Sequence, residues 1–181
     1  MCGIVGYIGE KQAEDILMTG LKRLEYRGYD SAGVALVNED TLHTTKREGK
    51  VKELASALES APIEGTVGIG HTRWATHGPP SDRNAHPHVS SNGDFALVHN
   101  GIIENNGVLR KRLKEKGYSF QSDTDTEVLV YLIEEVQKNA GLELPEAVRQ
   151  ALTQVIGTYG IAVVSASDPD LLVAARKGSP L

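Results

Sequence analysis

The stretch Met1-Cys2-Gly3-Ile4-Val5-Gly6 contains the only cysteine of the chain, one residue after the initiator methionine. If that methionine is removed, Cys2 carries both a thiol and a free α-amino group. The amino group has an unperturbed pKa of roughly 7.7–8.0, so part of it is neutral near pH 7 and accepts a proton. A terminal amine that activates its own nucleophile is one form of covalent catalysis. We therefore expect Cys2 to be a nucleophile; the alternative is a buried, inert cysteine at a processed terminus.

Length and composition describe an ordinary globular domain. The 181 residues suffice for one domain with a sizeable core, and the apolar and charged fractions are 40% and 24%. A formal net charge of −5 gives no reason to expect nucleic acid or an anionic membrane as a partner. The single cysteine rules out an internal disulfide, and we find no secretory signal or membrane-spanning run, so we expect a cytoplasmic protein. Neither a dinucleotide fingerprint nor a P-loop is present, and no nucleotide cofactor is expected.

Hydrophobic periodicity divides the chain into strands and helices. Gly3 to Gly9 is an apolar run typical of a strand buried on both faces. Further strands are predicted at 34–37, 42–47, 67–70, 95–99, 159–166 and 171–175, and helices at 11–24, 51–58, 105–116, 128–136 and 146–155. The strands come in groups, without the strict alternation of a doubly wound sheet. Two packed sheets with helices on both outer faces therefore fit best.

Capping signals mark the start of two of these helices. Asn105 or Asn106 is expected to cap the helix that runs to Lys116. Thr124 and Glu127 have the spacing of a capping box ahead of the apolar helix at 128–136.

The segment HTRWATHGPPSDRNAHPHVSS, residues 71–91, is predicted to be a long loop, and loops of this length are usually functional or disordered. Its mixed His, Arg, Trp and Thr content argues against plain disorder. Arg73 in this loop could hold a carboxylate through a two-pronged contact. Asp125, near the start of a helix, could hold an ammonium group. Together they would recognise both ends of an α-amino acid, unless Arg73 is a solvated surface residue and Asp125 only complements a helix terminus.

Asn100-Gly101 follows a predicted strand at a turn. The asparagine amide and the glycine backbone N–H offer two donors to one developing oxyanion. The alternative is a simple Asn-Gly turn.

Histidines also allow a metal-dependent interpretation. Zinc could be held by some of His71, His77, His86, His88, His99 and Asp82. None of them has the His-Glu-x-x-His spacing that makes such an assignment specific, so we do not expect a metal.

Taken together, these motifs resemble a known family. The matching segments are residues 2–6 (CGIVG), 24–33 (LEYRGYDSAG), 71–78 (HTRWATHG), 84–88 (NAHPH), 99–105 (HNGIIEN) and 124–127 (TDTE). They resemble, in the same order, the glutaminase domain of the glutamine–fructose-6-phosphate aminotransferases, which are class II glutamine amidotransferases with an N-terminal nucleophile. Amidophosphoribosyltransferases and asparagine synthetases share the N-terminal cysteine, but their arginine-glycine and substrate loops differ.

The resemblance implies an α+β fold, the four-layer αββα sandwich of the N-terminal nucleophile hydrolases. It implies that Cys2 is the nucleophile, with its α-amino group as base. It also implies that the Asn100 side chain and the Gly101 backbone N–H form the oxyanion hole. The remaining roles are implied for the substrate: the glutamine carboxylate is held by Arg73, Thr76 and His77, its amino group by Asp125, and Trp74 lies in the covering loop and gates ammonia.

The implied reaction is hydrolysis of the side-chain amide of L-glutamine through a Cys2 thioester, without cofactor or metal. The ammonia would convert fructose 6-phosphate to glucosamine 6-phosphate in hexosamine biosynthesis. Residues 1–181 would then be one glutaminase domain that continues past Leu181, with a homodimeric sugar-isomerase domain outside them. Two alternatives stay open: an amidotransferase with another ammonia acceptor, and a non-catalytic amino-acid-binding module in which Cys2 is structural.

Overall fold

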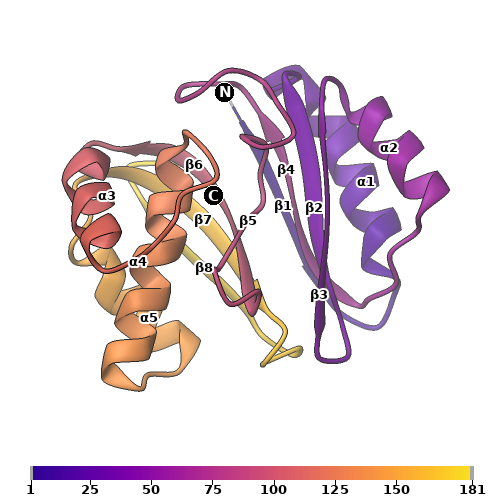
Figure 1. The fold of residues 1–181 in the computed structure, drawn as a ribbon. Coiled ribbons are helices and arrows are strands. Elements are labelled where there is room, and N and C mark those ends of the chain that lie inside the picture. Colours follow the sequence, from indigo (N-terminus) through magenta and orange to yellow (C-terminus); the bar gives the residue numbers. More distant parts are fainter. Residues whose placement is uncertain (1, 180–181) are drawn as a thin grey trace.

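The computed structural model describes residues 2–179, so Met1 and its expected removal lie outside the described part of the chain. Two antiparallel sheets of four strands pack face to face (Figure 1). The first has the order β1-β4-β2-β3, with β1 Gly3–Ile8, β4 Val67–Arg73, β2 Ser31–Asn38 and β3 Thr41–Glu48. The second has the order β5-β6-β7-β8, with β5 His88–Val89, β6 Phe95–Ile103, β7 Gly157–Ser165 and β8 Leu172–Lys177.

Helices cover the outer face of each sheet (Figure 1). The first sheet is covered by α1 (Ala13–Leu24) and α2 (Val51–Ser60), and a short 3-10 helix, η1 (Glu25–Arg27), follows α1. The second sheet is covered by α3 (Asn106–Glu115), α4 (Asp125–Ala140) and α5 (Leu144–Leu152). The predicted α+β, four-layer αββα arrangement is confirmed.

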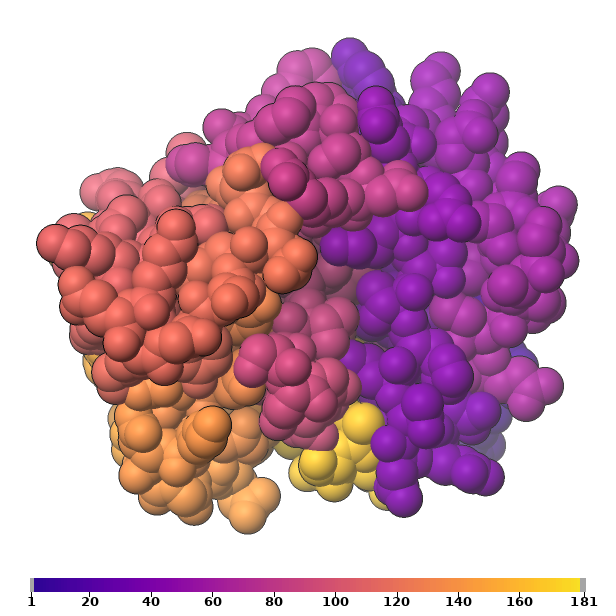
Figure 2. Space-filling view, in the orientation of Figure 1, coloured from indigo at the N-terminus to yellow at the C-terminus, as the bar shows by residue number. Residues whose placement is uncertain are grey.

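Three apolar cores lie between the four layers. The core between α1, α2 and the first sheet contains Leu17, Leu21 and Leu54. The sheets meet through smaller side chains, among them Ile69 and Val98. The core beneath α3, α4 and α5 is the largest and includes Phe95, Leu129 and Leu132. On the face in Figure 2, the segment around residues 75–95 lies between the N-terminal and C-terminal halves.

Strand alternation explains where the inter-sheet core becomes polar. Successive side chains of a strand point to opposite faces, so the row through Val67 and Ile69 on β4 continues with His71. The facing row through Ala96 and Val98 on β6 continues with Asn100. Both apolar rows therefore end, at the same end of the sandwich, in residues that hydrogen bond to each other.

Several predicted boundaries are wrong, because polar residues continue strands that the apolar pattern seemed to end. Strand β4 runs through Arg73, so His71 and Arg73 are strand residues and not part of a loop. Strand β6 runs to Ile103, so Asn100-Gly101 lies inside a strand and not at a turn. Strand β1 was predicted to be buried on both faces, but it lies at a sheet edge and is partly exposed.

The predicted caps are only partly confirmed. Asn105 makes no side-chain cap for α3: its Nδ2 donates to the Gln154 carbonyl at 2.9 Å and its Oδ1 accepts from Ile156 N at 3.0 Å. Thr124 does cap α4, accepting from Glu127 N at 3.3 Å. The reciprocal half of the capping box is absent among the described hydrogen bonds, because the Glu127 carboxylate binds the preceding loop.

Within residues 2–179, no helix combines the length and apolar character needed to cross a membrane.

Candidate active site

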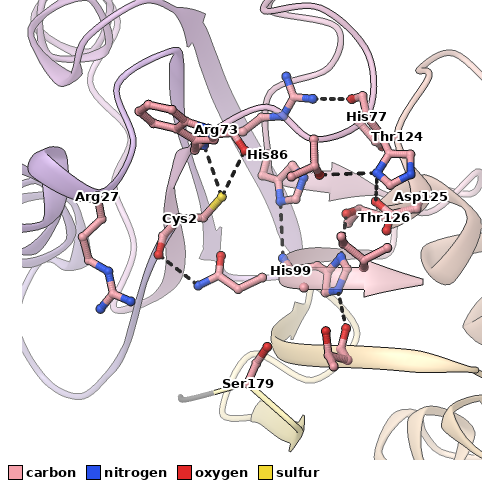
Figure 3. Close-up of a pocket in the computed structure, with 16 residues that line it drawn as sticks. Cys2, Arg27, Arg73, His77, His86, His99, Thr124, Asp125, Thr126 and Ser179 are labelled. Carbon is pink, nitrogen blue, oxygen red and sulfur yellow. Dashed lines mark hydrogen bonds and ion pairs between the residues drawn. The ribbon is translucent and has the colours of Figure 1, made fainter. Parts of the chain in front are cut away.

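A cavity of about 400 Å³ opens at the end of the sandwich where the inter-sheet rows become polar (Figure 3). It is lined by segments that are far apart in the sequence. The structure brings every sequence-predicted site residue to its wall, namely Cys2, Arg73, Trp74, Thr76, His77, Asn100, Gly101 and Asp125. This clustering was expected, whereas the roles of the individual residues stay predictions.

Cys2 lies directly before β1, an edge strand of the first sheet. Its Sγ accepts a hydrogen bond from Trp74 N at 3.2 Å and lies 3.5 Å from the Trp74 carbonyl oxygen (Figure 3). Burial raises the pKa of the Cys2 thiol, although the Trp74 backbone and the charge of Arg73 act in the opposite direction. Because the raised pKa keeps the sulfur protonated near neutral pH, nucleophilic use of this thiol requires a nearby base.

Asn100 and Gly101 come from β6, which packs against the sheet that carries Cys2. The Asn100 Nδ2 donates to the Cys2 carbonyl at 3.3 Å, so the amide group lies next to Cys2. Gly101 has a φ of +132°, and a Cβ there would lie 2.1 Å from the Thr158 carbonyl oxygen. Only glycine fits this position, because a side chain would be both strained and in collision with β7.

Arg73 ends β4 and is 3% exposed, which excludes the solvated surface position that was its alternative. Its guanidinium donates to the carbonyl of His77 (Figure 3), to that of Gly78 at 3.2 Å and to that of Pro79 at 3.5 Å. In this structure Arg73 thus orders the loop that follows β4. A substrate carboxylate would have to use its remaining donors or replace some of these carbonyls.

The loop after Arg73 is also fixed from the other side. The Asp30 carboxylate accepts from Ala75 N and lies 3.8 Å from the Arg73 Nη1. Trp74 is 47% exposed and packs edge-on against Tyr29, with ring centroids 5.3 Å apart. The indole therefore lies at the mouth of the cavity, and the Trp74 backbone hydrogen bonds to Cys2.

Asp125 is the first residue of α4 and is 5% exposed. Its Oδ2 accepts from Ile103 N at 2.8 Å, which ties the helix terminus to the end of β6. Its Oδ1 lies 3.9 Å from His77 Nδ1, on the cavity wall (Figure 3). One carboxylate oxygen therefore ties the helix to β6, and the other lies near His77 on the cavity wall.

Four buried histidines form a cluster next to the cavity: His86 and His99 line its wall, and His71 and His88 pack against His86. The His71 and His86 rings stack with centroids 4.2 Å apart, and His88 packs edge-on against His86 at 5.0 Å. His99 Nδ1 lies 3.0 Å from Thr126 Oγ1. Burial lowers the pKa of all four, to about 3 for His71, and the rings are therefore neutral near pH 7.

The zinc alternative finds no support in this geometry. Across the described range 2–179, no three His, Cys, Asp or Glu side chains are grouped so that they could hold a metal ion. Four of the predicted ligands have other partners: His71 hydrogen bonds to Asn100, His88 and His99 hydrogen bond to threonines, and His86 accepts from the His99 backbone N–H.

Two residues on or next to the cavity were missed as functional candidates. Asp30 belongs to a motif that the sequence singled out, and an acid directly before an apolar strand was the available signal. Arg27 lines the cavity, and its Nε is buried without a hydrogen-bond partner among residues 2–179.

The chain is similar to known proteins over its whole length. The chain is 57% identical to glutamine–fructose-6-phosphate aminotransferase (isomerizing) of Chlorobaculum tepidum over 185 residues, and 57% identical to that of Bacteroides thetaiotaomicron over 182 residues. Each alignment covers 100% of this chain but only 30% of the relative, so the chain spans less than a third of these curated proteins.

A solved structure shares the whole fold. The glutamine phosphoribosylpyrophosphate amidotransferase from B. subtilis superposes with a TM-score of 0.83 at 28% identity, covering 98% of this chain and 37% of that one. The sandwich is thus of the N-terminal nucleophile type. In addition, residues 71–178 match the family described as glutamine amidotransferase domain. The chain therefore belongs to the family of glutamine amidotransferase domains.

Proposed function

We propose that this chain is a glutaminase domain that hydrolyses the side-chain amide of L-glutamine to glutamate and ammonia. The observation that carries the proposal is the position of the Asn100 amide, 3.3 Å from the Cys2 carbonyl, in the cavity that also holds Asp125 and Arg73. A nucleophile, an oxyanion donor and two opposite charges are what amide hydrolysis of an amino acid requires.

In the proposed mechanism the free α-amino group of Cys2 takes the thiol proton, which compensates for the raised pKa of the thiol. The thiolate attacks the side-chain carbonyl carbon of glutamine, and the oxygen becomes an anion held by the Asn100 amide and the Gly101 N–H. Collapse of this intermediate breaks the C–N bond, and the ammonium of Cys2 protonates the leaving nitrogen. Water, activated by the same amine, then hydrolyses the thioester to glutamate and regenerates the thiol.

The two ends of the substrate would be recognised by charge. Asp125 accepts from the α-ammonium group, and Arg73, Thr76 and His77 hold the α-carboxylate. Trp74 covers the bound glutamine at the mouth of the cavity. A ligand without either charged group leaves a buried charge unpaired, which is how such sites reject analogues.

In its longer protein, we propose, the released ammonia converts fructose 6-phosphate to glucosamine 6-phosphate in a homodimeric sugar-isomerase domain. Support comes from relatives at 57% identity that are named glutamine–fructose-6-phosphate aminotransferase, while the phosphoribosylpyrophosphate enzyme is 28% identical. A cytoplasmic location belongs to the same proposal. An amidotransferase with another acceptor is the remaining enzyme alternative.

The test is labelling with an electrophilic glutamine analogue, followed by intact mass and peptide mapping. We expect a starting mass that lacks Met1, one adduct on Cys2, and protection by excess glutamine. A folded, processed chain that reacts with iodoacetamide but neither with the analogue nor with glutamine contradicts the proposal.

Two controls separate the alternatives. Cys2→Ala should abolish glutamine hydrolysis but keep glutamine binding, whereas a binding module would be unaffected in function. A preparation that wholly retains Met1 should be inactive, because the α-amino group of Cys2 is then part of a peptide bond. Turnover by such a preparation would refute the role of the amine.

A further inference from the structure

We infer that His71 is a positioning residue that holds the Asn100 side-chain amide with its NH₂ group toward Cys2. The inference rests on the proposed function, in which Asn100 stabilises the oxyanion. It starts from one contact: the His71 Nε2 lies 2.9 Å from the Asn100 Oδ1, across the interface between the two sheets.

The contact on the side of Asn100 away from His71 shows which way the Asn100 side-chain amide is turned. The group that faces it there is the Cys2 carbonyl oxygen, 3.3 Å from Nδ2, and a carbonyl oxygen only accepts hydrogen bonds. With the amide reversed, two acceptor oxygens would face each other at this distance. The Asn100 Oδ1 is therefore the atom that faces His71, and the His71 Nε2 must carry the proton.

The state of the His71 ring agrees with this assignment. The ring is completely buried, and its Nδ1 makes no hydrogen bond of normal geometry within the described chain, so the contact of Nε2 with Asn100 decides which nitrogen carries the proton. Burial lowers the pKa of His71 to about 3, although the contacts with Asn100 and with the His99 backbone oppose this shift. The neutral ring with its proton at Nε2 is thus the form that donates to Asn100.

The position of the ring is rigid. Strand β4 is paired on both sides, and His71 stands opposite Ile4 on β1 and opposite Gly33 on β2. The His86 ring stacks on it with an interplanar angle of 24°. His71 therefore offers its donor from a fixed point, which is the requirement for orienting a neighbouring amide.

The consequence for catalysis follows from the two hydrogens of the amide NH₂ group. One is used by the Cys2 carbonyl, and the other stays available to an oxyanion. Without a donor at the His71 Nε2 position, the amide can rotate and present its oxygen to the developing negative charge. Such a loss affects the transition state more than the bound substrate, because the oxyanion exists only in the former.

The experiment compares two amide substitutions at position 71. The side-chain NH₂ of Gln reaches about as far as the imidazole Nε2, whereas that of Asn is one carbon shorter. We expect His71→Asn to lower kcat by about 10- to 1,000-fold, up to the effect of deleting one oxyanion donor, with KM for glutamine changed less than about threefold. His71→Gln should recover most of the loss. Equal activity of the Asn variant and the unmodified chain, or equal loss in both variants, overturns the inference.

Matched controls keep the outcome unambiguous. Thr72→Val removes a buried hydroxyl without a described partner from the adjacent position of the same strand, and should leave kcat unchanged. Iodoacetamide labels Cys2 without forming an oxyanion, and its rate should be the same in all folded variants. If the unmodified chain does not hydrolyse glutamine, the proposed function fails; if it does and His71→Asn is folded and fully active, only the role of His71 fails.

Discussion

At the scale of single residues, Cys2 combines a reactive position with a thiol that is reluctant to ionise. Burial is the largest effect on its pKa and raises it, so the thiolate fraction at neutral pH is smaller than in an exposed cysteine. The rate of alkylation by iodoacetamide should therefore keep rising with pH, about tenfold per unit, without a plateau below pH 8.5. Mass spectrometry of samples quenched at successive times, between pH 6.5 and 9.5, measures this rate. A plateau near pH 7 would show a thiolate already stabilised in the free protein.

Gly101 is the second residue whose environment allows a sharp prediction. Gly101→Ala adds left-handed strain and places a methyl group against the Thr158 carbonyl, 2.1 Å away. We expect it to lower the free energy of unfolding by roughly 2–5 kcal/mol, measured by urea denaturation. Gly93 is the matched control, since its φ is +78° but nothing lies within 4 Å of an added Cβ. Gly93→Ala should lower the free energy of unfolding by only about 1–2 kcal/mol. An equal loss in the Gly101→Ala and Gly93→Ala variants would mean that β7 moves away from the added methyl group at no cost.

At the scale of elements, the N-terminus of α4 places Asp125 in the cavity. Thr124 caps the helix, and the buried Glu127 carboxylate accepts from Gln121 N at 2.8 Å and from Ser122 N at 2.7 Å. Helix α4 is therefore attached to the loop before it at two backbone amides. This clamp, and not only the capping box, is what the Thr-Asp-Thr-Glu motif provides.

Glu127→Gln tests the clamp, because a glutamine offers one acceptor oxygen and turns donors toward the loop amides. We expect the free energy of unfolding to fall by about 1–3 kcal/mol. We also expect KM for glutamine to rise, because the change displaces Asp125. Urea denaturation and steady-state kinetics measure the two effects. Glu146→Gln on α5, which removes an exposed pair with Arg149, should change neither quantity. An unchanged KM in a destabilised Glu127→Gln variant would show that the Glu127 contacts stabilise the fold but do not position Asp125 for glutamine binding.

At the scale of the whole molecule, the interface between the sheets is apolar along most of its length and histidine-rich at the cavity end. His71, His86, His88 and His99 are neutral in the folded protein because burial lowers their pKa values. On unfolding they regain an ordinary pKa of about 6.5 and bind protons. The unfolded state therefore binds more protons below that pH.

The sign of the pH dependence follows from this difference. Stability is fully present above pH 6.5 and is lost as the pH falls toward about 3, the folded pKa of His71. Each buried histidine contributes a slope of up to about 1.4 kcal/mol per pH unit. Urea denaturation between pH 6.5 and 5, above the range of ordinary carboxylates, should show it. His88→Gln removes one of the buried histidines and should reduce the slope by the contribution of one proton, up to about 1.4 kcal/mol per pH unit. His43→Gln, at an exposed position of β3, should leave the slope unchanged.

Much of the fold was predictable because most elements carry a local signal. The apolar periodicity located α1, α2 and α5 to within a few residues, and Thr124 marked the start of α4. The grouping of strands indicated two packed sheets. The motifs predicted the eight site residues, and in the structure all eight line one cavity.

Local patterns were thus enough to predict most of the elements, the sandwich and the residues with chemistry. The folded molecule was needed to show that β4 and β6 continue through polar residues, that β1 is an edge strand, and that Arg73 binds the carbonyls of its own loop. The physical reason is separation along the chain. His71 and Asn100 are 29 positions apart, and Asn100 and Cys2 are 98 apart, so each hydrogen bond depends on how two sheets pack and not on any local pattern.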